Sequence, residues 1–257
     1  MRFRPCIDIH NGKIKQIVGG SLEDKGDNAK ENFVSKRDGA YYASLYKRDN
    51  LKGGHIIMLN PTDSKYYESN YKQAKHALQV YPGGLQIGGG INNENAKEFL
   101  NLGASHVIVT SFVFKDGNIN YKNLKKLKTT IGKEKLVLDL SCRKKDNEYY
   151  IVTDRWQHFT NVKLNHETLD HLSDFCDEFL IHGVDVEGKS SGIEEDLVLI
   201  LGKWNLLPIT YAGGVGSYSD IELINKLGNS KIDITIGSSL DIFGGTLEYK
   251  KVVEMCK

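Results

Sequence analysis

Two carboxylates follow short apolar runs at equivalent places in the two halves of the chain. Asp8 lies in CIDIH and Asp139 in VLDLS, and each run has the length and composition of a buried strand. A lone aspartate after a strand is usually a turn or cap residue, whereas a matched pair suits an acid and a base. The pair predicts proton transfer at a carbon that bears a C–O or C–N bond.

Two glycine clusters repeat in the same manner. Gly89 and Gly90 lie in LQIGGGINNENAKEFLNLGASHVIVTS, and Gly213 and Gly214 lie in ITYAGGVGSYSDIELINKLGNSKIDITIGSS. Glycine lets backbone N–H groups approach an anion closely, and the start of a following helix adds positive potential. We therefore expect a phosphate site at each cluster. The alternative is that these glycines only make tight turns.

Small hydroxyl residues end the strand that follows each glycine cluster. Thr110 and Ser111 occupy this place in the first half, and Gly237 and Ser238 occupy it in the second. Their N–H and hydroxyl groups would add donors to the same anions. A phosphate site after the last two strands is common in α/β barrels, and here the first half has a second copy.

The spacing of these landmarks indicates an internal duplication. The last glycines of the clusters lie 124 residues apart (214 − 90), the serines 127 (238 − 111) and the aspartates 131 (139 − 8). Each separation is close to half of the 257-residue chain. We expect two similar half-barrels, of about residues 1–132 and 133–257, and a small-molecule ligand with a phosphate at each end.

Apolar runs alternate with helix-like segments along the chain. The expected strands are Phe3–Ile9, His55–Leu59, Leu85–Ile87, His106–Val109, Leu136–Leu140, Glu178–His182, Leu207–Ala212 and Ile232–Ile236. The expected helices are Ser44–Arg48, Tyr71–Val80, Asn93–Leu102, Tyr121–Ile131, His166–Phe175, Glu194–Trp204, Ser219–Leu227 and a last one from Leu247. Continuous apolar strands are typical of parallel sheets covered by helices. The pattern predicts one domain, residues 1–257, folded as an α/β (β/α)8 TIM barrel; a doubly wound open sheet is the alternative.

Two long polar segments interrupt this alternation. One runs over residues 19–38 and the other over residues 141–164, with a possible hairpin at Tyr149–Thr153. Loops that follow barrel strands border the active-site face. Long ones are candidates for lids, or else inert surface insertions.

Charge and composition limit the classes of partner that the protein is expected to bind. The formal net charge is +1, without the basic excess of a nucleic-acid or membrane-surface protein. No stretch approaches the length of a membrane span, and no apolar N-terminal run resembles a signal peptide. We expect a soluble, cytoplasmic protein that acts as a monomer.

The four cysteines do not form a metal-binding or redox pattern. Cys6, Cys142, Cys176 and Cys256 include no C-x-x-C pair, so free thiols in a reducing compartment are expected. No G-x-G-x-x-G fingerprint with a ribose-binding acid is present, and we expect neither metal nor cofactor. A nucleophilic Cys142 with His182 as its base has little support.

Six blocks together resemble one enzyme family. They are CIDIHNGKIKQIVGG, GGGI, LVLDLSCRKK, FLIHGVDVEG, YAGG and GSSLDIFGG, spread from Pro5 to about Gly245. The chain resembles the phosphoribosylformimino-5-aminoimidazole carboxamide ribotide isomerases of histidine biosynthesis, in their eukaryotic type. The resemblance implies a duplicated barrel, a bisphosphorylated substrate and a cofactor-free Amadori rearrangement of an aminoaldose to an aminoketose. It also implies that Asp8 is the base and Asp139 the acid.

The chain departs from the bacterial members of this family at several positions. After the sixth strand it reads VDVEGKSSG, which places Glu187 at an acidic position of the bacterial enzymes and His182 at a small hydroxyl position. Glu187 is therefore an alternative acid, and Asp185 lies nearby. The family also implies that Trp156 stacks on the ligand, although a tryptophan that only packs its loop would fit the sequence too.

Asn60 marks a further departure, because bacterial relatives have an aspartate pair where this chain reads MLNPTDS. Asn60 therefore either contacts the ligand or only forms an Asn-Pro turn.

Two other functions remain open. One is the imidazole glycerol phosphate synthase cyclase subunit, which is also a duplicated barrel but has a lysine where this chain has His10 and docks a glutaminase partner. The other is a non-catalytic phospho-ligand-binding barrel, in which both aspartates would be idle.

Overall fold

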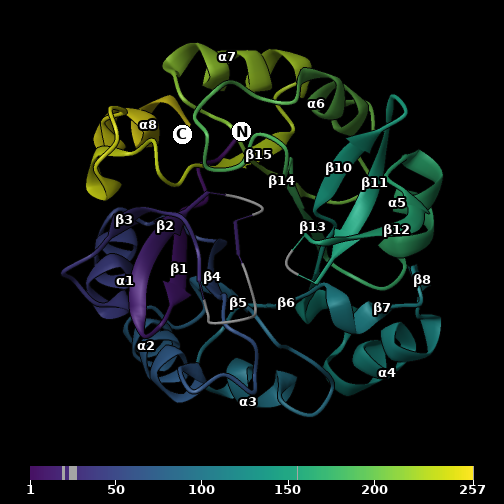
Figure 1. Cartoon of the computed structure of the whole chain (residues 1–257), viewed down its shortest axis with the longest axis horizontal. Coiled ribbons are helices and arrows are strands. Elements are labelled where there is room, and N and C mark those ends of the chain that lie inside the picture. Colours follow the sequence, from purple (N-terminus) through teal and green to yellow (C-terminus); the bar gives the residue numbers. More distant parts are fainter. Residues whose placement is uncertain (19–20, 23–27, 155, 257) are drawn as a thin grey trace.

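Parallel strands form a ring at the centre of the molecule (Figure 1). The structure is a computed structural model that describes residues 1–18, 21–22, 28–154 and 156–256. In spatial order, which is also chain order, the strands are β1 (Cys6–His10), β4 (Gly54–Met58), β5 (Leu85–Gly88), β6 (Val107–Val109), β9 (Leu136–Asp139), β13 (Glu178–His182), β14 (Ile209–Ala212) and β15 (Ile232–Thr235).

The ring closes between its first and last strands. A parallel bridge joins Phe3 to Ile234. The Arg4 amide donates to the Ile234 carbonyl at 2.8 Å, and the Ile234 amide donates to the Arg2 carbonyl at 2.9 Å. The predicted (β/α)8 barrel is therefore confirmed over the open doubly wound sheet, whose edge strands would stay apart.

Helices surround the ring in chain order, one after each strand (Figure 1). They are α1 (Gly39–Arg48), α2 (Tyr67–Val80), α3 (Ala96–Asn101), α4 (Tyr121–Ile131), α5 (His166–Ser173), α6 (Glu195–Gly202), α7 (Tyr218–Leu227) and α8 (Tyr249–Met255). Short 3-10 turns lie at Ser111–Val113, Lys133–Lys135 and Asp241–Phe243. Among the described residues, no helix is both long and apolar enough to cross a bilayer.

Several helix boundaries differ from the prediction for local reasons. α1 begins at Gly39 rather than Ser44, because the Asp38 side chain caps it by accepting from the Tyr41 amide. α3 begins at Ala96 rather than Asn93, because the Asn92 side chain accepts from the amides of the next residues in an Asx turn.

Two strands begin later than predicted, directly at or after a proline. β1 begins at Cys6 after Pro5, and β14 begins at Ile209 after Pro208. Proline has no N–H to donate to a strand ladder. Phe3 therefore contributes only an isolated bridge to the barrel.

Both long segments contain strands of their own. β2 (Lys13–Ile17) pairs antiparallel with β1, and β3 (Glu31–Val34) pairs with β2. The first long segment is therefore partly sheet; its residues 19–20 and 23–27 lie outside the described residues. A two-strand ribbon, β7 (Phe114–Lys115) with β8 (Asn118–Ile119), follows β6.

The second long segment forms a three-stranded antiparallel sheet. Its strands are β10 (Cys142–Lys145), β11 (Glu148–Thr153) and β12 (His158–Lys163). The predicted hairpin at Tyr149–Thr153 is wrong, because these residues form one strand. The tight turn lies instead at Asp146 and Asn147, whose φ angles are 50° and 62°, a conformation that both residue types tolerate.

The barrel interior is layered along its axis. Ile57, Ile108, Val137 and Leu180 pack together as an apolar cluster inside the ring. On β13, Glu178 lies two residues before Leu180 and His182 lies two residues after it. Since alternate residues of a barrel strand point inward, the apolar layer separates a polar layer below from the carboxyl ends of the strands above.

Candidate active site

Two neighbouring cavities open at the carboxyl ends of the strands. We name them the Gly213 cavity and the Gly89 cavity after the glycine cluster that each contains. They enclose about 760 and 1230 Å³ of space, part of which is open solvent. Both are lined by Ile57, Leu59, Asp139 and Trp156. They thus form one groove with a glycine cluster at each end.

The two glycine clusters have matching backbone conformations. The φ angles are 100° and 70° at Gly89 and Gly90, and 124° and 75° at Gly213 and Gly214. A Cβ at Gly89 would clash with the carbonyl of Met58. These positions therefore require glycine on geometric grounds. The tight-turn alternative accounts for the same geometry, so the phosphate role stays a prediction.

Each pair of strand-end residues lies in the same cavity as its glycine cluster. Thr110 and Ser111 line the Gly89 cavity, and Gly237 and Ser238 line the Gly213 cavity. The Ser111 hydroxyl accepts a hydrogen bond from the Asp154 amide at 3.1 Å. The loop after β11 therefore contacts the first of these sites.

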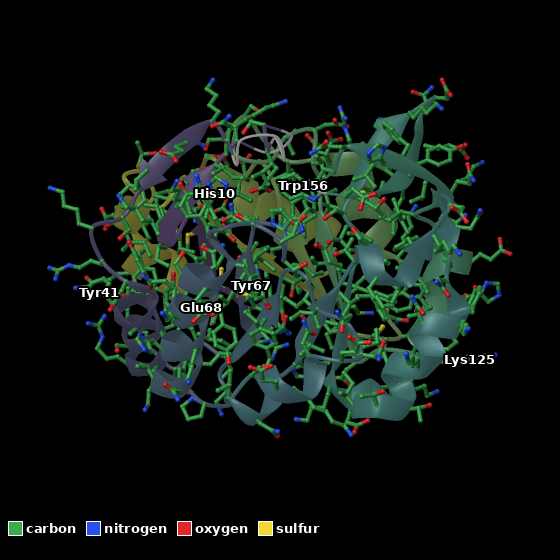
Figure 2. The ribbon with its side chains drawn as sticks, turned by 60° about the horizontal axis from the view of Figure 1, so that its bottom comes forward. His10, Tyr41, Tyr67, Glu68, Lys125 and Trp156 are labelled. Atoms are coloured by element: carbon green, nitrogen blue, oxygen red, sulfur yellow. The ribbon has the colours of Figure 1, made fainter. Side chains whose placement is uncertain are left out.

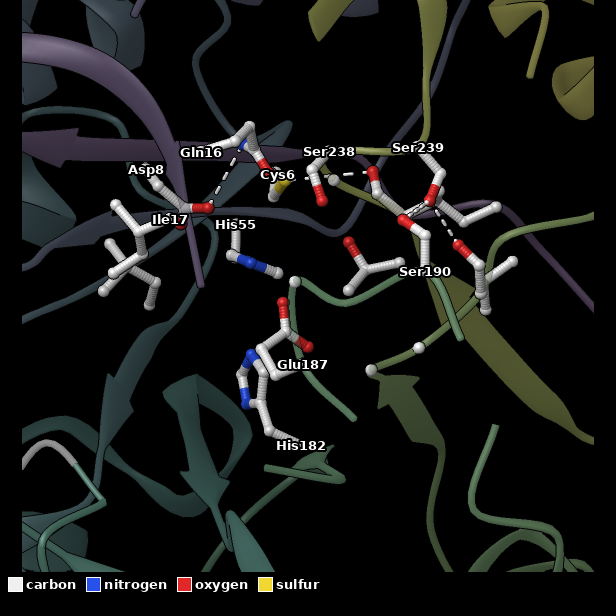
Figure 3. Close-up of a pocket in the computed structure, with 18 of the residues that line it drawn as sticks. Cys6, Asp8, Gln16, Ile17, His55, His182, Glu187, Ser190, Ser238 and Ser239 are labelled. Carbon is white, nitrogen blue, oxygen red and sulfur yellow. Dashed lines mark hydrogen bonds between the residues drawn. The ribbon is translucent and has the colours of Figure 1, made fainter. Parts of the chain in front are cut away.

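Asp8 lies on β1 and lines the Gly213 cavity. Its carboxylate accepts a hydrogen bond from the Gln16 side chain on β2 at 3.3 Å, as Figure 3 shows. Burial raises the pKa of Asp8 to about 7, with help from the negative charge of Glu187 and against the charge of His182. A carboxyl with such a pKa is suited to general base catalysis near neutral pH.

Asp139 ends β9 and is held by three donors. Its Oδ1 accepts from the Ser141 amide at 2.9 Å and from the Ser141 hydroxyl at 2.6 Å, and lies 3.4 Å from His182 Nδ1. Burial alone would favour the neutral acid, but the charge of His182 and these hydrogen bonds hold the pKa of Asp139 below its usual value. Asp139 is therefore an anion at neutral pH.

His182 ends β13, the strand beside β9, and its ring forms part of the wall of the Gly213 cavity. Burial opposes its positive charge, but Asp139 outweighs burial and raises the pKa of His182 to about 9, with Glu187 and Asp8 contributing. The ring packs edge-on against His55, at 6.2 Å between centroids. Burial and the charge of His182 lower the pKa of His55 to about 3, so His55 is neutral.

Glu187 and Asp185 differ in what they contact. Glu187 lines the Gly213 cavity beside His182 (Figure 3), and its buried Oε2 has no hydrogen-bond partner among the described residues. Burial raises the pKa of Glu187. Asp185 instead accepts from Arg143 at 2.8 Å and from the Lys144 amide at 3.0 Å. Asp185 therefore ties β10 to the loop after β13.

Trp156 lies over the middle of the groove and lines both cavities. Figure 2 shows it midway between the two sides of the molecule, in the upper part of the view, whereas Tyr41 and Lys125 lie at the left and right edges. Its ring is 5.8 Å from that of His182, and its φ angle of 69° is unusual for a bulky residue. The predicted stacking on a ligand stays a prediction, but the position permits it.

Asn60 and His10 both contact residues that pack around β1. Asn60 accepts from the Asn11 amide at 2.8 Å and from the Asn70 side chain at 2.7 Å, which ties the β1–β2 turn to the start of the β4–α2 loop. It also lines the Gly89 cavity. His10 is buried beside the Lys15 ammonium, and that ammonium forms an ion pair with Glu31.

Sequence reasoning did not single out Gln16, Ser141 or His55. The sequence does contain a signal for Ser141, because an aspartate side chain can accept a hydrogen bond from the backbone amide two residues later. Gln16 and His55 gave no signal, because each reaches the site only once β2 and β4 lie beside β1. Among the described residues, no group of three His, Cys, Asp or Glu side chains is placed to hold a metal ion.

Comparison with known proteins gives a single family. A family model described as histidine biosynthesis protein matches residues 2–246. A protein of Medicago truncatula is 54% identical over 98% of this chain and 81% of its own length; it is named a chloroplastic 1-(5-phosphoribosyl)-5-((5-phosphoribosylamino)methylideneamino)imidazole-4-carboxamide isomerase.

Two fungal proteins share that isomerase name. The protein of Yarrowia lipolytica is 48% identical over 95% of this chain and 93% of its own length. The protein of Saccharomyces cerevisiae is 46% identical over 96% of this chain and 94% of its own length. With a barrel fold, matched glycine clusters and identity of this extent over nearly its whole length, the chain belongs to the histidine biosynthesis protein family.

Proposed function

We propose that this protein is the isomerase for which its relatives are named. It converts the phosphoribosylamino (aminoaldose) side of the substrate into the phosphoribulosyl aminoketose by an Amadori rearrangement. The observation that supports this most is the placement of Asp8 and Asp139 in one groove with a glycine cluster at each end.

The groove suits a long ligand with a phosphate at each end. One phosphate would lie at Gly89 and Gly90 with Thr110 and Ser111, and the other at Gly213 and Gly214 with Gly237 and Ser238. Glycines with positive φ angles let backbone N–H groups approach an anion closely, which supports a phosphate at each cluster. The flat face of Trp156 would meet the imidazole carboxamide between the phosphates.

The chemistry needs a proton donor and a base in turn. A donor protonates the ribose ring oxygen, the C1′–O bond breaks, and the nitrogen lone pair forms a C1′=N bond. Asp8 then takes the C2′ proton, and the electrons form the C1′=C2′ bond of an enolamine. Protonation at C1′ and loss of the 2′-hydroxyl proton give the ketone. The Asp8 pKa of about 7 leaves a large share of this group ready to accept a proton.

The proton donor is assigned to one of Asp139, His182 and Glu187, which line the Gly213 cavity together with Asp8. The sequence-based assignment of Asp139 itself as the acid, with Glu187 as its alternative, stays a proposal. The low pKa of Asp139 speaks against the carboxyl as the group that supplies the proton in the free protein.

A coupled turnover assay tests this function. We expect the protein to consume the aminoaldose in the presence of a chelator, with a glutaminase–cyclase of another source as the coupling enzyme. Asp8→Asn should lower kcat by about 100-fold or more and leave substrate affinity within about tenfold, because the base acts on the reacting carbon and not on the phosphates.

The matched control is Asp116→Asn at the exposed β7–β8 turn, which should retain full activity. Saturable binding of the substrate without turnover would favour the non-catalytic barrel over the isomerase. Neither binding nor turnover would mean that the glycine clusters are only tight turns.

A further inference from the structure

The contacts of Asp139 help to identify which residue donates the proton in the proposed reaction. Its Oδ1 faces three donors: the Ser141 amide, the Ser141 hydroxyl and His182 Nδ1. Each of these contacts favours the carboxylate over the carboxylic acid. Burial favours the neutral acid, but the charge of His182 and these hydrogen bonds hold the pKa of Asp139 below its usual value, so the carboxylate is the form present at pH 7. We therefore look for the proton donor among the neighbours of Asp139.

The orientation of the His182 ring leaves one nitrogen for the groove. Because the Ser141 hydroxyl gives its proton to Asp139 at 2.6 Å, Nδ1 of His182 must itself be the donor toward Asp139 and Ser141. Among the described residues, Nε2 has no hydrogen-bond partner, and the ring lines the Gly213 cavity. A carboxylate that fixes one ring nitrogen so that the other can exchange a proton is a recurring catalytic arrangement.

We propose that His182, oriented by Asp139 and Ser141, is the residue that protonates the ribose ring oxygen, and that Asp139 is a positioning residue. This inference rests on the proposed isomerase function. Nε2 gives its proton to the ring oxygen as the C1′–O bond breaks. The neutral imidazole later takes the 2′-hydroxyl proton as the ketone forms, which restores the imidazolium. Asp8 moves the other proton from C2′ to C1′, so that no proton is gained or lost overall.

Burial opposes a charged His182 ring, but the three carboxyl groups around it outweigh burial. Asp139 faces it from β9, Asp8 from β1 and Glu187 from the loop after β13, and all three favour the imidazolium. His55 faces it from β4 and is neutral. Trp156 lies beside it on the loop after β11, at 5.8 Å between ring centroids.

Glu187 is a weaker candidate because of where it points. Its Oε2 lies 3.4 Å from the position that a Cβ at Gly213 would occupy, at one end of the groove and within the second predicted phosphate site. In its protonated form, which burial favours, the Glu187 carboxyl is placed to donate to a phosphate oxygen at that end of the ligand rather than to the ring oxygen midway along it.

A measurement without substrate tests the protonation state directly. Histidine ring resonances of the whole protein, labelled with ¹⁵N, are followed by NMR from pH 5 to pH 10. His182 is assigned by the resonance that disappears in His182→Gln, or in His182→Asn if the first variant does not fold. We expect an imidazolium that persists through pH 8 and a titration shifted by two units or more toward acid in Asp139→Asn. A neutral His182 at pH 7 would overturn the proposal.

Kinetics test the role. His182→Gln should lower kcat by about 100-fold or more, keep KM within about threefold and lose the alkaline limb of the pH profile. His106→Gln, which removes another histidine that pairs with an aspartate outside the groove, should change none of these. An unchanged alkaline limb in His182→Gln would overturn the assignment, and its loss in Glu187→Gln alone would transfer it to Glu187.

The two proposals fail in different ways. Turnover by a protein whose His182 is neutral at pH 7 would overturn the donor assignment and leave the isomerase function in place. An imidazolium at pH 7 in a protein that does not turn over the aminoaldose would overturn the function and the donor role with it.

Discussion

Asp8 and His182 have pKa values shifted upward for different reasons. Burial and the charge of Glu187 raise the pKa of Asp8 to about 7, whereas Asp139 raises that of His182 to about 9 against the effect of burial. A base must be deprotonated and a donor protonated in the active form. Activity should therefore rise as the pH increases through about 7 and fall as it increases through about 9.

A bell-shaped profile of kcat/KM for the aminoaldose is the expected result, and its two limbs belong to the interacting set of groups rather than to single residues. Steady-state rates from pH 5 to pH 10 in a buffer of constant ionic strength provide the measurement. A profile that still rises above pH 9.5 would contradict the need for a protonated donor.

At the scale of single residues, the two aspartates of the site could be predicted from the sequence, but the side chains that contact them could not. Asp8 and Asp139 stood out because the internal repeat pairs them. Gln16 and His55 did not, because a side chain's contact with a residue on another strand depends on strand order, which no local pattern states. The sequence alone did not decide whether Asp139 or Glu187 is the acid, because the hydrogen bonds from Ser141 to Asp139 are visible only in the structure.

Among the elements, the β5–α3 turn offers a direct test of the phosphate role. Gly90 has a φ angle of 70°, and a Cβ there would meet the movable side chain of Thr62. Gly83, in the turn before β5, has a nearly equal φ of 72° with nothing within 4 Å of such a Cβ. The two glycines therefore share their backbone strain and differ in what surrounds them.

Gly90→Ala and Gly83→Ala should each lower the free energy of unfolding by about 1–2 kcal/mol, the cost of a left-handed alanine. Only Gly90→Ala should raise KM, by about tenfold, because the methyl group would keep a phosphate away from the backbone amides. Urea unfolding and initial rates measure the two effects. Equal KM values in both variants would leave the first cluster as a tight turn.

The elements most poorly predicted are those whose apolar pattern is weak. β2 and β3 lie in polar sequence; β2 pairs with the end of β1, and β3 pairs with β2. The β10–β12 sheet is separate from the barrel and is joined by a bridge from Cys142 to Gly183, just after β13. The barrel strands were recognised because they are buried on both faces and read as apolar runs. Their largest shifts, of three and two residues, lie at the starts of β1 and β14, where Pro5 and Pro208 interrupt pairing; other ends differ from the prediction by one residue.

For the molecule as a whole, a buried ion cluster lies at the closure of the barrel. Arg4 donates to Glu178 on β13 at 2.8 Å and to Asp233 on β15 at 2.7 Å, and all three side chains are buried. Arg2 also pairs with Asp233, but its side chain is 63% exposed. The cluster fills the end of the barrel opposite the groove.

Arg4→Met should therefore lower the free energy of unfolding by about 3–5 kcal/mol, because Glu178 is left buried without a cation and Asp233 keeps only the exposed Arg2. Arg2→Met should cost less than about 1 kcal/mol, as expected for an exposed pair. Denaturant unfolding at pH 7 measures both. Equal losses in the two variants would contradict the view that the buried cluster holds the barrel closed.

The (β/α)8 barrel could be predicted from the sequence because eight apolar runs, matched glycines and matched aspartates agree on one arrangement. The division into half-barrels near residue 132 stays a prediction. The prediction is supported by the similar conformations of the two glycine clusters and by a 3-10 turn after the fourth strand of each half.

The most direct test of the central claim is to observe the substrate itself. The aminoaldose, labelled with ¹³C at C1′, is incubated with the protein and with Asp8→Asn, and C1′ is followed by NMR. We predict that C1′ changes from a methine to a methylene carbon with the wild-type protein and stays unchanged with the variant on the same time scale. A C1′ that remains a methine with saturating wild-type protein would contradict the isomerase function, and equal conversion by Asp8→Asn would contradict Asp8 as the base.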